Sequence, residues 1–148
     1  MKNILFICTG NTCRSPMAER FFNQFARGEA PEWQASSAGL HVSGTPDAAS
    51  CNAIAVAREY GVDLADHRSQ RLSQSLVDEA HLLLTMEGWQ KEAVAAEFPQ
   101  AAGKVHTLLE FVGEHGDIGD PISQSLDVYR TRAEEIMQAV QKLVDQLR

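Results

Sequence analysis

Residues 4–16 read ILFICTGNTCRSP, an apolar run followed by a small polar loop and a helix start. The apolar residues 4–7 predict a fully buried strand. Ser15 followed by Pro16 predicts the start of a helix, because a hydroxyl caps free backbone N–H groups and proline suits the first turn. We therefore expect a strand, a loop and a helix in immediate succession, with Gly10 giving the loop a positive φ.

Short apolar runs alternate with amphipathic segments along the rest of the chain. Further strands are expected at residues 33–37, 82–84 and 105–109, and further helices at 45–60, 87–98 and from the loop after Pro121 to the end. The βαβαβαβα order predicts an α/β fold. It would be a single domain over residues 1–148, with a four-stranded, mostly parallel sheet and helices on both faces. Ligands bind such sheets beyond the carboxyl ends of the strands, where residues 8–15 follow the first strand.

Composition and charge narrow the class of protein. The 148 residues are 44% hydrophobic and carry a net charge of −7 at pH 7, which disfavours a nucleic acid or an anionic membrane as partner. No apolar run approaches the roughly 18 residues of a membrane span, and residues 4–7 are too short for a signal-peptide core. We therefore expect a cytoplasmic protein in which the sparse cysteines form no disulfide framework.

The loop at residues 8–15 places a cysteine and an arginine, with five residues between them, after a buried strand and before a helix. The backbone N–H groups of such a loop and the positive end of the helix dipole suit a phosphate dianion, and the planar fork of Arg14 can bind two phosphate oxygens. The same field is expected to lower the pKa of Cys8, to which Ser15 can donate, and to make it a nucleophile. The alternative is a plain turn with an incidental cysteine. A Walker nucleotide loop is excluded because no Gly-Lys-Ser/Thr sequence follows.

The segment CTGNTCRSPMAE, residues 8–19, resembles the low-molecular-weight protein tyrosine phosphatase family, and especially its bacterial protein-arginine phosphatase branch. Residues 37–39, His67 and the Asp-Pro pair at 120–121 lie where the family has counterparts, so the likeness covers nearly the whole chain. The resemblance implies the phosphatase fold of that family and phosphorylated proteins as substrates.

Site roles follow from this resemblance. It implies that Cys8 is the nucleophile, that Arg14 binds the phosphate, and that Asp120 is the general acid and later the general base. It also implies that Ser37 and His67 support the loop, in one network with two of the loop residues, Asn11 and Ser15. The phosphate-binding loop would consist of Thr9, Gly10, Asn11, Thr12, Cys13 and Ser15 besides the nucleophile and the arginine.

The chemistry explains the need for Asp120. The conjugate acid of a phenolate leaving group has a pKa of about 10 and that of a guanidine about 13.8, so neither leaves readily without a proton. A positioned acid contributes a rate factor of about 10²–10⁴. In the second step the same carboxylate would activate water against a phosphocysteine. The alternative interpretation of Asp120 is a plain Asp-Pro turn.

Two positions bear on the leaving group. Thr12 stands where tyrosine-directed members usually have a bulky aliphatic residue, and Ile122-Ser123 follow the Asp-Pro pair where those members often have aromatic walls. Both departures favour phosphoarginine, with phosphotyrosine as the alternative. Residues 41–42 are candidates for another pocket wall. An arsenate reductase is less favoured because no cysteine follows Cys51, and a non-catalytic phosphate-binding module would be expected to have lost one of the three catalytic residues.

The histidines predict no metal site, and we expect no cofactor. No pair of them has helical ligand spacing, and no cysteine accompanies them. His115 with Asp117 and Asp120 is the only candidate cluster, and we interpret it as a solvated acidic loop.

Two cysteines and a tryptophan allow further hypotheses. Cys13 lies in the same loop as Cys8 and could trap an oxidised Cys8 as a disulfide, or could simply pack in the loop. Cys51 is expected to be a packed thiol, and Trp89 to be a core or edge residue rather than a binding platform.

Overall fold

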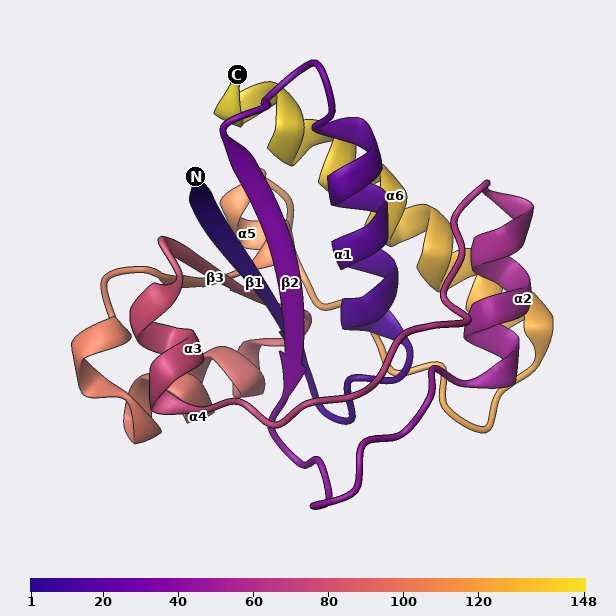
Figure 1. Cartoon of the computed structure of the whole chain (residues 1–148), viewed down its shortest axis with the longest axis horizontal. Coiled ribbons are helices and arrows are strands. Elements are labelled where there is room, and N and C mark those ends of the chain that lie inside the picture. The colour runs from indigo at the N-terminus through magenta and orange to yellow at the C-terminus, as the bar shows by residue number, and fades with distance from the viewer.

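The apolar run at 4–7 lies in β1 (Lys2–Cys8), a central strand of the computed structural model, which describes residues 1–148. Strands β2 (Trp33–Gly39) and β3 (Leu82–Thr85) pair in parallel with β1 on either side, and β4 (Val105–Thr107) pairs in parallel with β3. The predicted parallel sheet is therefore confirmed. Because every strand runs the same way, the carboxyl ends meet at one edge of the sheet, the lower edge in Figure 1.

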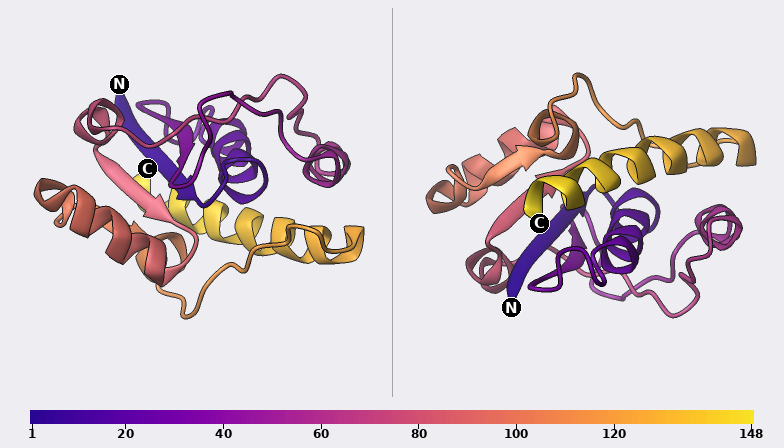
Figure 2. Two further views of the ribbon diagram at one scale, coloured as in Figure 1. Left: turned by 90° about the horizontal axis from the view of Figure 1, so that it is seen from below. Right: turned by 90° about the horizontal axis from the view of Figure 1, so that it is seen from above.

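Helices cover both faces of the sheet (Figure 2). They have to, because successive apolar residues of β1 point to opposite faces and both faces need burial. The helices are α1 (Arg14–Phe25), α2 (Cys51–Glu59), α3 (Gln74–Glu79), α4 (Gly88–Glu97), the 3₁₀ turn η1 (Pro99–Ala101), α5 (Leu108–Phe111) and α6 (Leu126–Leu147). Ile4 and Phe6 pack into a core with α1 and α6, whereas Leu5 and Ile7 pack into a second core with α3 and α4. No helix combines the length and the apolar character needed to cross a bilayer.

The second helix begins later than predicted. It starts at Cys51, because the Ser50 side chain accepts a hydrogen bond from the Ala53 N–H and so caps that end. Asp47, predicted to lie in its first turn, is tied to another segment instead. Its N–H donates to Ser69 Oγ at 2.8 Å, and its carbonyl accepts from the Ser69 N–H at 2.7 Å.

Two further differences have local causes. The fourth strand ends at Thr107, not 109, because the Thr107 side chain accepts from the Glu110 N–H and the Glu110 carboxylate accepts from the Thr107 N–H, a capping box that starts α5. Helix α3 was not predicted. It spans 6 residues, too short to show a helical repeat, and is capped by Ser73.

Candidate active site

The predicted loop lies where β1 ends and α1 begins, at the carboxyl edge of the sheet (Figure 1). Cys8 is the last residue of β1, Arg14 is the first residue of α1, and both are buried. They border a cavity of about 240 Å³, whose lining consists of Cys8, Thr9, Gly10, Thr12, Cys13, Arg14, His41, Asp120 and Ile122. The structure thus places the three predicted catalytic residues on one cavity.

Asn11 is fully buried and holds the loop together. Its Nδ2 donates to Ser15 Oγ at 2.8 Å and to Ser37 Oγ at 2.9 Å, and its Oδ1 accepts from the Gln70 N–H at 2.9 Å. Its carbonyl lies 2.8 Å from His67 Nε2. The structure therefore joins the four residues of the supporting network expected from the sequence and adds Gln70.

Two expectations about this loop are wrong. The positive φ falls on Asn11, at 55°, and not on Gly10; asparagine tolerates this conformation, and here its side chain is bonded on both ends. Ser15 does not cap α1, whose N-cap is Cys13 without a side-chain hydrogen bond. The Ser15 hydroxyl is directed to the nucleophile instead.

The Cys8 sulfur is surrounded by donors. Ser15 Oγ lies 2.9 Å from Cys8 Sγ, and since Ser15 Oγ already accepts from Asn11 Nδ2, its own hydrogen is left for the sulfur. The Asn11 N–H donates to the sulfur at 3.3 Å. Burial raises the pKa of the Cys8 thiol, whereas the Ser15 hydroxyl, the Arg14 charge and two backbone N–H groups lower it. Burial is the larger effect, so the lowered pKa expected from the loop alone is opposed and exceeded.

The Arg14 guanidinium is held by two groups that were not predicted from the sequence. Its Nη1 donates to Glu87 Oε2 at 2.6 Å and to the Ile118 carbonyl at 2.7 Å. Its Nη2 lies 3.6 Å from Asp120 Oδ2. One side of the fork is thereby fixed by the protein, which leaves the other side for an anion in the cavity.

Gln90 links Glu87 to the loop. This glutamine is fully buried in the first turn of α4, and its Oε1 accepts from the N–H groups of Met86 and Glu87, both at 3.0 Å. Its Nε2 donates to Thr9 Oγ1 at 3.1 Å. Polar residues just beyond the carboxyl end of β3 were the sequence signal that could have identified Glu87 and Gln90.

The two carboxylate oxygens of Asp120 have different partners. Its Oδ1 accepts from the Ile122 N–H at 3.0 Å, which shapes the turn after the Asp-Pro pair. Its Oδ2 borders the cavity near Arg14, and the side chain is 38% exposed. The second oxygen can therefore exchange a proton with a group that sits over Cys8.

The Cys13 sulfur contacts two hydroxyl groups. Its Sγ lies 3.4 Å from both Ser50 Oγ and Tyr129 Oη, which are 3.3 Å apart. Burial and the Cys13 contact raise the pKa of Tyr129 to about 12. Cys51, by contrast, is exposed and not the packed thiol that was expected.

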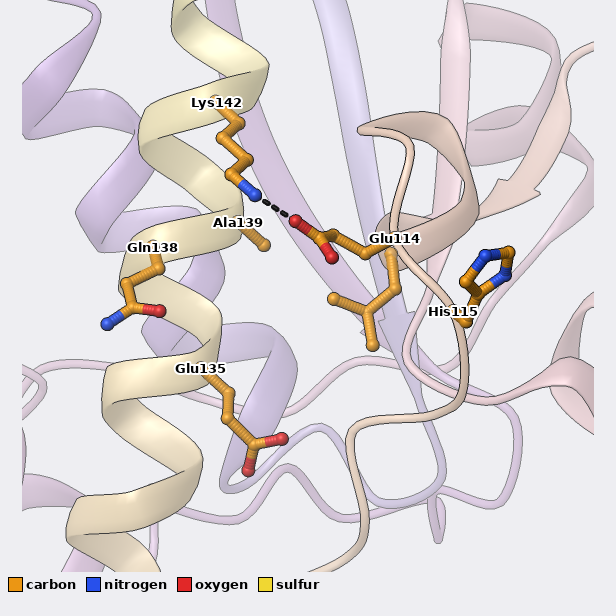
Figure 3. A pocket seen from close by; sticks show the side chains of 7 residues that line it. Glu114, His115, Glu135, Gln138, Ala139 and Lys142 are labelled. Carbon is orange, nitrogen blue, oxygen red and sulfur yellow. Dashed lines mark hydrogen bonds and ion pairs between the residues drawn. The ribbon is translucent and has the colours of Figure 1, made fainter.

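The three residues that formed the only candidate metal cluster, His115, Asp117 and Asp120, lie in different surroundings. His115 lines a second cavity of about 240 Å³ beside α6, where Lys142 pairs with Glu114 (Figure 3). Asp117 accepts from the Gly88 N–H at 2.9 Å, and Asp120 belongs to the first cavity. No three His, Cys, Asp or Glu side chains come together as a metal site would need.

Comparison with known proteins extends over the whole chain. A family model described as "Low molecular weight phosphotyrosine protein phosphatase" matches residues 3–148. The chain is similar to the protein-arginine-phosphatase of Bacillus subtilis, at 37% identity over 147 residues, 99% of this chain and 97% of the relative. It is equally similar to a Ralstonia nicotianae protein named "Probable low molecular weight protein-tyrosine-phosphatase EpsP", at 37% identity over 149 residues, 100% of this chain and 97% of the relative.

A solved structure gives the same match in three dimensions. It is a cysteine-to-serine mutant of the YwlE arginine phosphatase with a phosphorylated active-site serine. The superposition has a TM-score of 0.93 at 37% identity and covers 98% of this chain and 95% of the other. The names of these relatives specify different phosphorylated side chains, arginine for the Bacillus subtilis protein and YwlE and tyrosine for the Ralstonia protein.

Proposed function

The chain belongs to the low molecular weight phosphotyrosine protein phosphatase family and is a cysteine-dependent hydrolase, and we propose that it removes phosphate from phosphoarginine residues of proteins. The observation that carries the choice of substrate is the position of Thr12, a residue of the nucleophile loop itself, in the lining of the cavity. A guanidinium is planar and rich in N–H donors, so it needs an acceptor and lateral room. The Thr12 hydroxyl supplies the acceptor, and its short side chain leaves the room.

In the first chemical step, the Cys8 sulfur, ionised to the thiolate, attacks phosphorus in the cavity. A P–S bond forms while the P–N bond to the guanidinium breaks, and the leaving nitrogen takes a proton from Asp120. Arg14 and the backbone N–H groups of the loop hold the phosphoryl oxygens, whose charge is spread in the transition state. The Ser15 hydroxyl stabilises the sulfur in its ionised form.

In the second step, a water molecule attacks the phosphocysteine from the side that the guanidinium has left. Asp120, now ionised, accepts a proton from that water, and the P–S bond breaks to release inorganic phosphate and the Cys8 thiolate. The phosphoserine in the YwlE mutant structure supports an intermediate on the residue at this place in a relative. No metal or cofactor is needed for either step, since Arg14 and the loop meet the phosphate charge.

Phosphotyrosine is the second candidate. It is favoured by the His41 ring, which borders the cavity and could flank a phenyl group. The name of the Ralstonia relative points the same way.

One comparison separates the candidates. We would measure kcat/KM on two peptides of identical flanking sequence, one carrying phosphoarginine and the other phosphotyrosine. We expect the phosphoarginine peptide to be hydrolysed with a kcat/KM at least about tenfold higher. A preference for the phosphotyrosine peptide would overturn the proposed substrate while leaving the hydrolase chemistry in place.

A further inference from the structure

His41 and Trp89 form a stacked aromatic pair at the mouth of the catalytic cavity. Their ring centroids are 6.2 Å apart with an interplanar angle of 14°, a geometry within the range of offset stacking. His41 lines the cavity, whereas Trp89 lies outside its lining and is 44% exposed. An exposed indole beside a residue of the cavity lining can contact the chain on either side of a bound phosphorylated residue.

The backbone around His41 is fixed to the nucleophile loop. The His41 N–H donates to the Thr9 carbonyl at 2.9 Å. Gly39 at the start of this loop leaves no room for a side chain, because an added Cβ would lie 2.6 Å from Val42 Cγ2 and 2.8 Å from the Thr9 carbonyl oxygen. The imidazole is thus carried on a closely packed segment.

Trp89 is fixed through both of its chain neighbours. The Gly88 N–H donates to Asp117 Oδ1 at 2.9 Å, and Gln90 Nε2 donates to Thr9 Oγ1 at 3.1 Å. The backbone that carries the indole is therefore tied to the loop before Asp120 and to the nucleophile loop, and the ring itself is stacked on His41.

The charges around this pair favour a cation. The basic residues of the nucleophile loop and of α4 are already paired with carboxylates, Arg14 with Glu87 at 2.6 Å and Lys91 with Glu110 at 2.7 Å. Asp117, which holds the residue before Trp89, has no basic partner. The rim therefore carries surplus negative charge, in a chain whose net charge is −7.

The two indoles of the chain differ in one respect. Lys2 Nζ lies 5.4 Å from the ring centroid of Trp33, so that indole already carries a cation on its face. Trp89 carries no Lys or Arg of its own chain. The part of its ring that His41 does not cover is available to a cation from another molecule.

We propose that Trp89, held by His41 and flanked by Asp117, forms a subsite for an arginine or lysine side chain next to the phosphorylated residue of a protein substrate. The subsite rests on the proposed function, because only a polypeptide substrate brings a flanking side chain to the mouth. An aromatic flanking residue would also stack on the indole but would gain nothing from the carboxylates.

The test uses three phosphoarginine peptides that differ only beside the phosphorylated residue, with arginine, alanine or phenylalanine in the flanking positions. For the wild type, we expect kcat/KM to be highest with the arginine flank. Trp89→Ala should lower the arginine-to-alanine ratio about fivefold, the size of one cation–π contact at an exposed site. Asp117→Asn, which keeps an acceptor for the Gly88 N–H, should lower the same ratio without loss of fold.

Trp33→Phe is the matched control. It removes the other indole, which lies at the amino end of β2, away from the edge of the sheet that carries the site, and it should keep the wild-type ratio. An unchanged ratio in both Trp89→Ala and Asp117→Asn would overturn the subsite, and so would a wild-type preference for the phenylalanine flank. Hydrolysis of a small aryl phosphate, which has no flanking residues, measures separately whether the nucleophile loop is active. If the enzyme hydrolyses the aryl phosphate and phosphotyrosine peptides but not phosphoarginine peptides, the proposed function fails, and the same flank series on phosphotyrosine then decides the subsite.

Discussion

The Arg14 guanidinium donates to the Glu87 carboxylate at 2.6 Å, across 73 residues of sequence, and this contact fixes the direction in which the guanidinium faces the cavity. Glu87 Oε2 is also 3.4 Å from Gln90 Nε2, so the carboxylate is itself held. The arginine is therefore oriented before any phosphate binds. Preorganisation of this kind lowers the cost of binding an anion and of stabilising its transition state.

Replacing Glu87 tests this relationship. Glu87→Gln keeps the size and the acceptor but removes the charge, so Arg14 should lose part of its alignment. A hydrogen bond to a charged group contributes about 1.5–3 kcal/mol, and we expect kcat/KM to fall at least about tenfold. Inhibition by inorganic phosphate should weaken in parallel, which a general loss of stability would not produce. Glu59→Gln, which removes a carboxylate paired with Arg130 on the surface, is the control. If both variants behave alike, Glu87 does not orient the arginine.

If Cys8 is the covalent nucleophile, replacing it should abolish turnover but leave phosphate binding intact. In Cys8→Ser, the loop and Arg14 remain, so inorganic phosphate should bind with a dissociation constant close to that of the wild type. Turnover should fall by several orders of magnitude, because a serine hydroxyl is not ionised at neutral pH. Cys51→Ser, at the exposed cysteine, should retain full activity. Residual activity of Cys8→Ser within tenfold of the wild type would exclude the phosphocysteine mechanism.

The Ser15 hydroxyl should control the pH at which Cys8 ionises. Burial raises the pKa of Cys8 and the Ser15 hydrogen bond lowers it, so Ser15→Ala should raise that pKa further. At any given pH the variant then has less thiolate, and the pH profile of Cys8 alkylation by iodoacetamide should move to higher pH.

Ser37→Ala provides the matched control for this experiment. It removes the other acceptor of Asn11 Nδ2 but does not contact the sulfur. Its alkylation profile should stay near that of the wild type. An identical midpoint for Ser15→Ala and the wild type would show that the hydroxyl does not act on the thiol.

The loop at 8–15 and the parallel sheet could be predicted from the sequence, whereas the side-chain contacts of Glu87 and Gln90 with the loop could not. The loop at 8–15 is short, and the strand, cysteine, arginine and helix start that define it are contiguous. The roles of Glu87 and Gln90 depend on β3 lying beside β1, which places two residues more than seventy positions away under Arg14 and Thr9. Such long-range contacts leave no periodic pattern in the sequence.

Conformational detail within the loop was also beyond the sequence. Glycine is the usual choice for a positive φ, yet here Asn11 takes it, because four groups on three other segments bond to the asparagine. The start of α2 was misplaced for a similar reason. A capping signal at 45–47 competes with one at Ser50, and contacts of Asp47 with Ser69 decide between them.

Asp120 as proton donor predicts a dependence on the leaving group. Asp120→Asn should keep the turn, since the amide oxygen can still accept from the Ile122 N–H. On a phosphoarginine peptide, kcat should fall by about 10²–10⁴, the usual contribution of a positioned acid. The loss should be much smaller on an aryl phosphate with an acidic phenol, which leaves without a proton. Equal losses on both substrates would instead indicate a structural role for the carboxylate.

Thr12 should set the choice between phosphoarginine and phosphotyrosine. Its backbone is anchored, because the Thr12 carbonyl accepts from the Ser50 N–H at 2.9 Å, so a substitution changes the side chain without releasing the loop. Thr12→Ile keeps the branch, adds a methylene and deletes the hydroxyl. A guanidinium would then lose an acceptor and face a crowded apolar wall, whereas a phenyl ring would gain contact.

The size of this effect follows from the cost of an unpaired buried donor, about 1–3 kcal/mol, or roughly 5- to 150-fold. We therefore expect Thr12→Ile to lower kcat/KM for the phosphoarginine peptide at least about tenfold and to spare or improve it for the phosphotyrosine peptide. Thr12→Ser keeps the hydroxyl and removes only a methyl group, so it should retain the wild-type preference. If Thr12→Ile lowers both substrates in parallel, Thr12 only packs the loop, and the argument for phosphoarginine loses its main support.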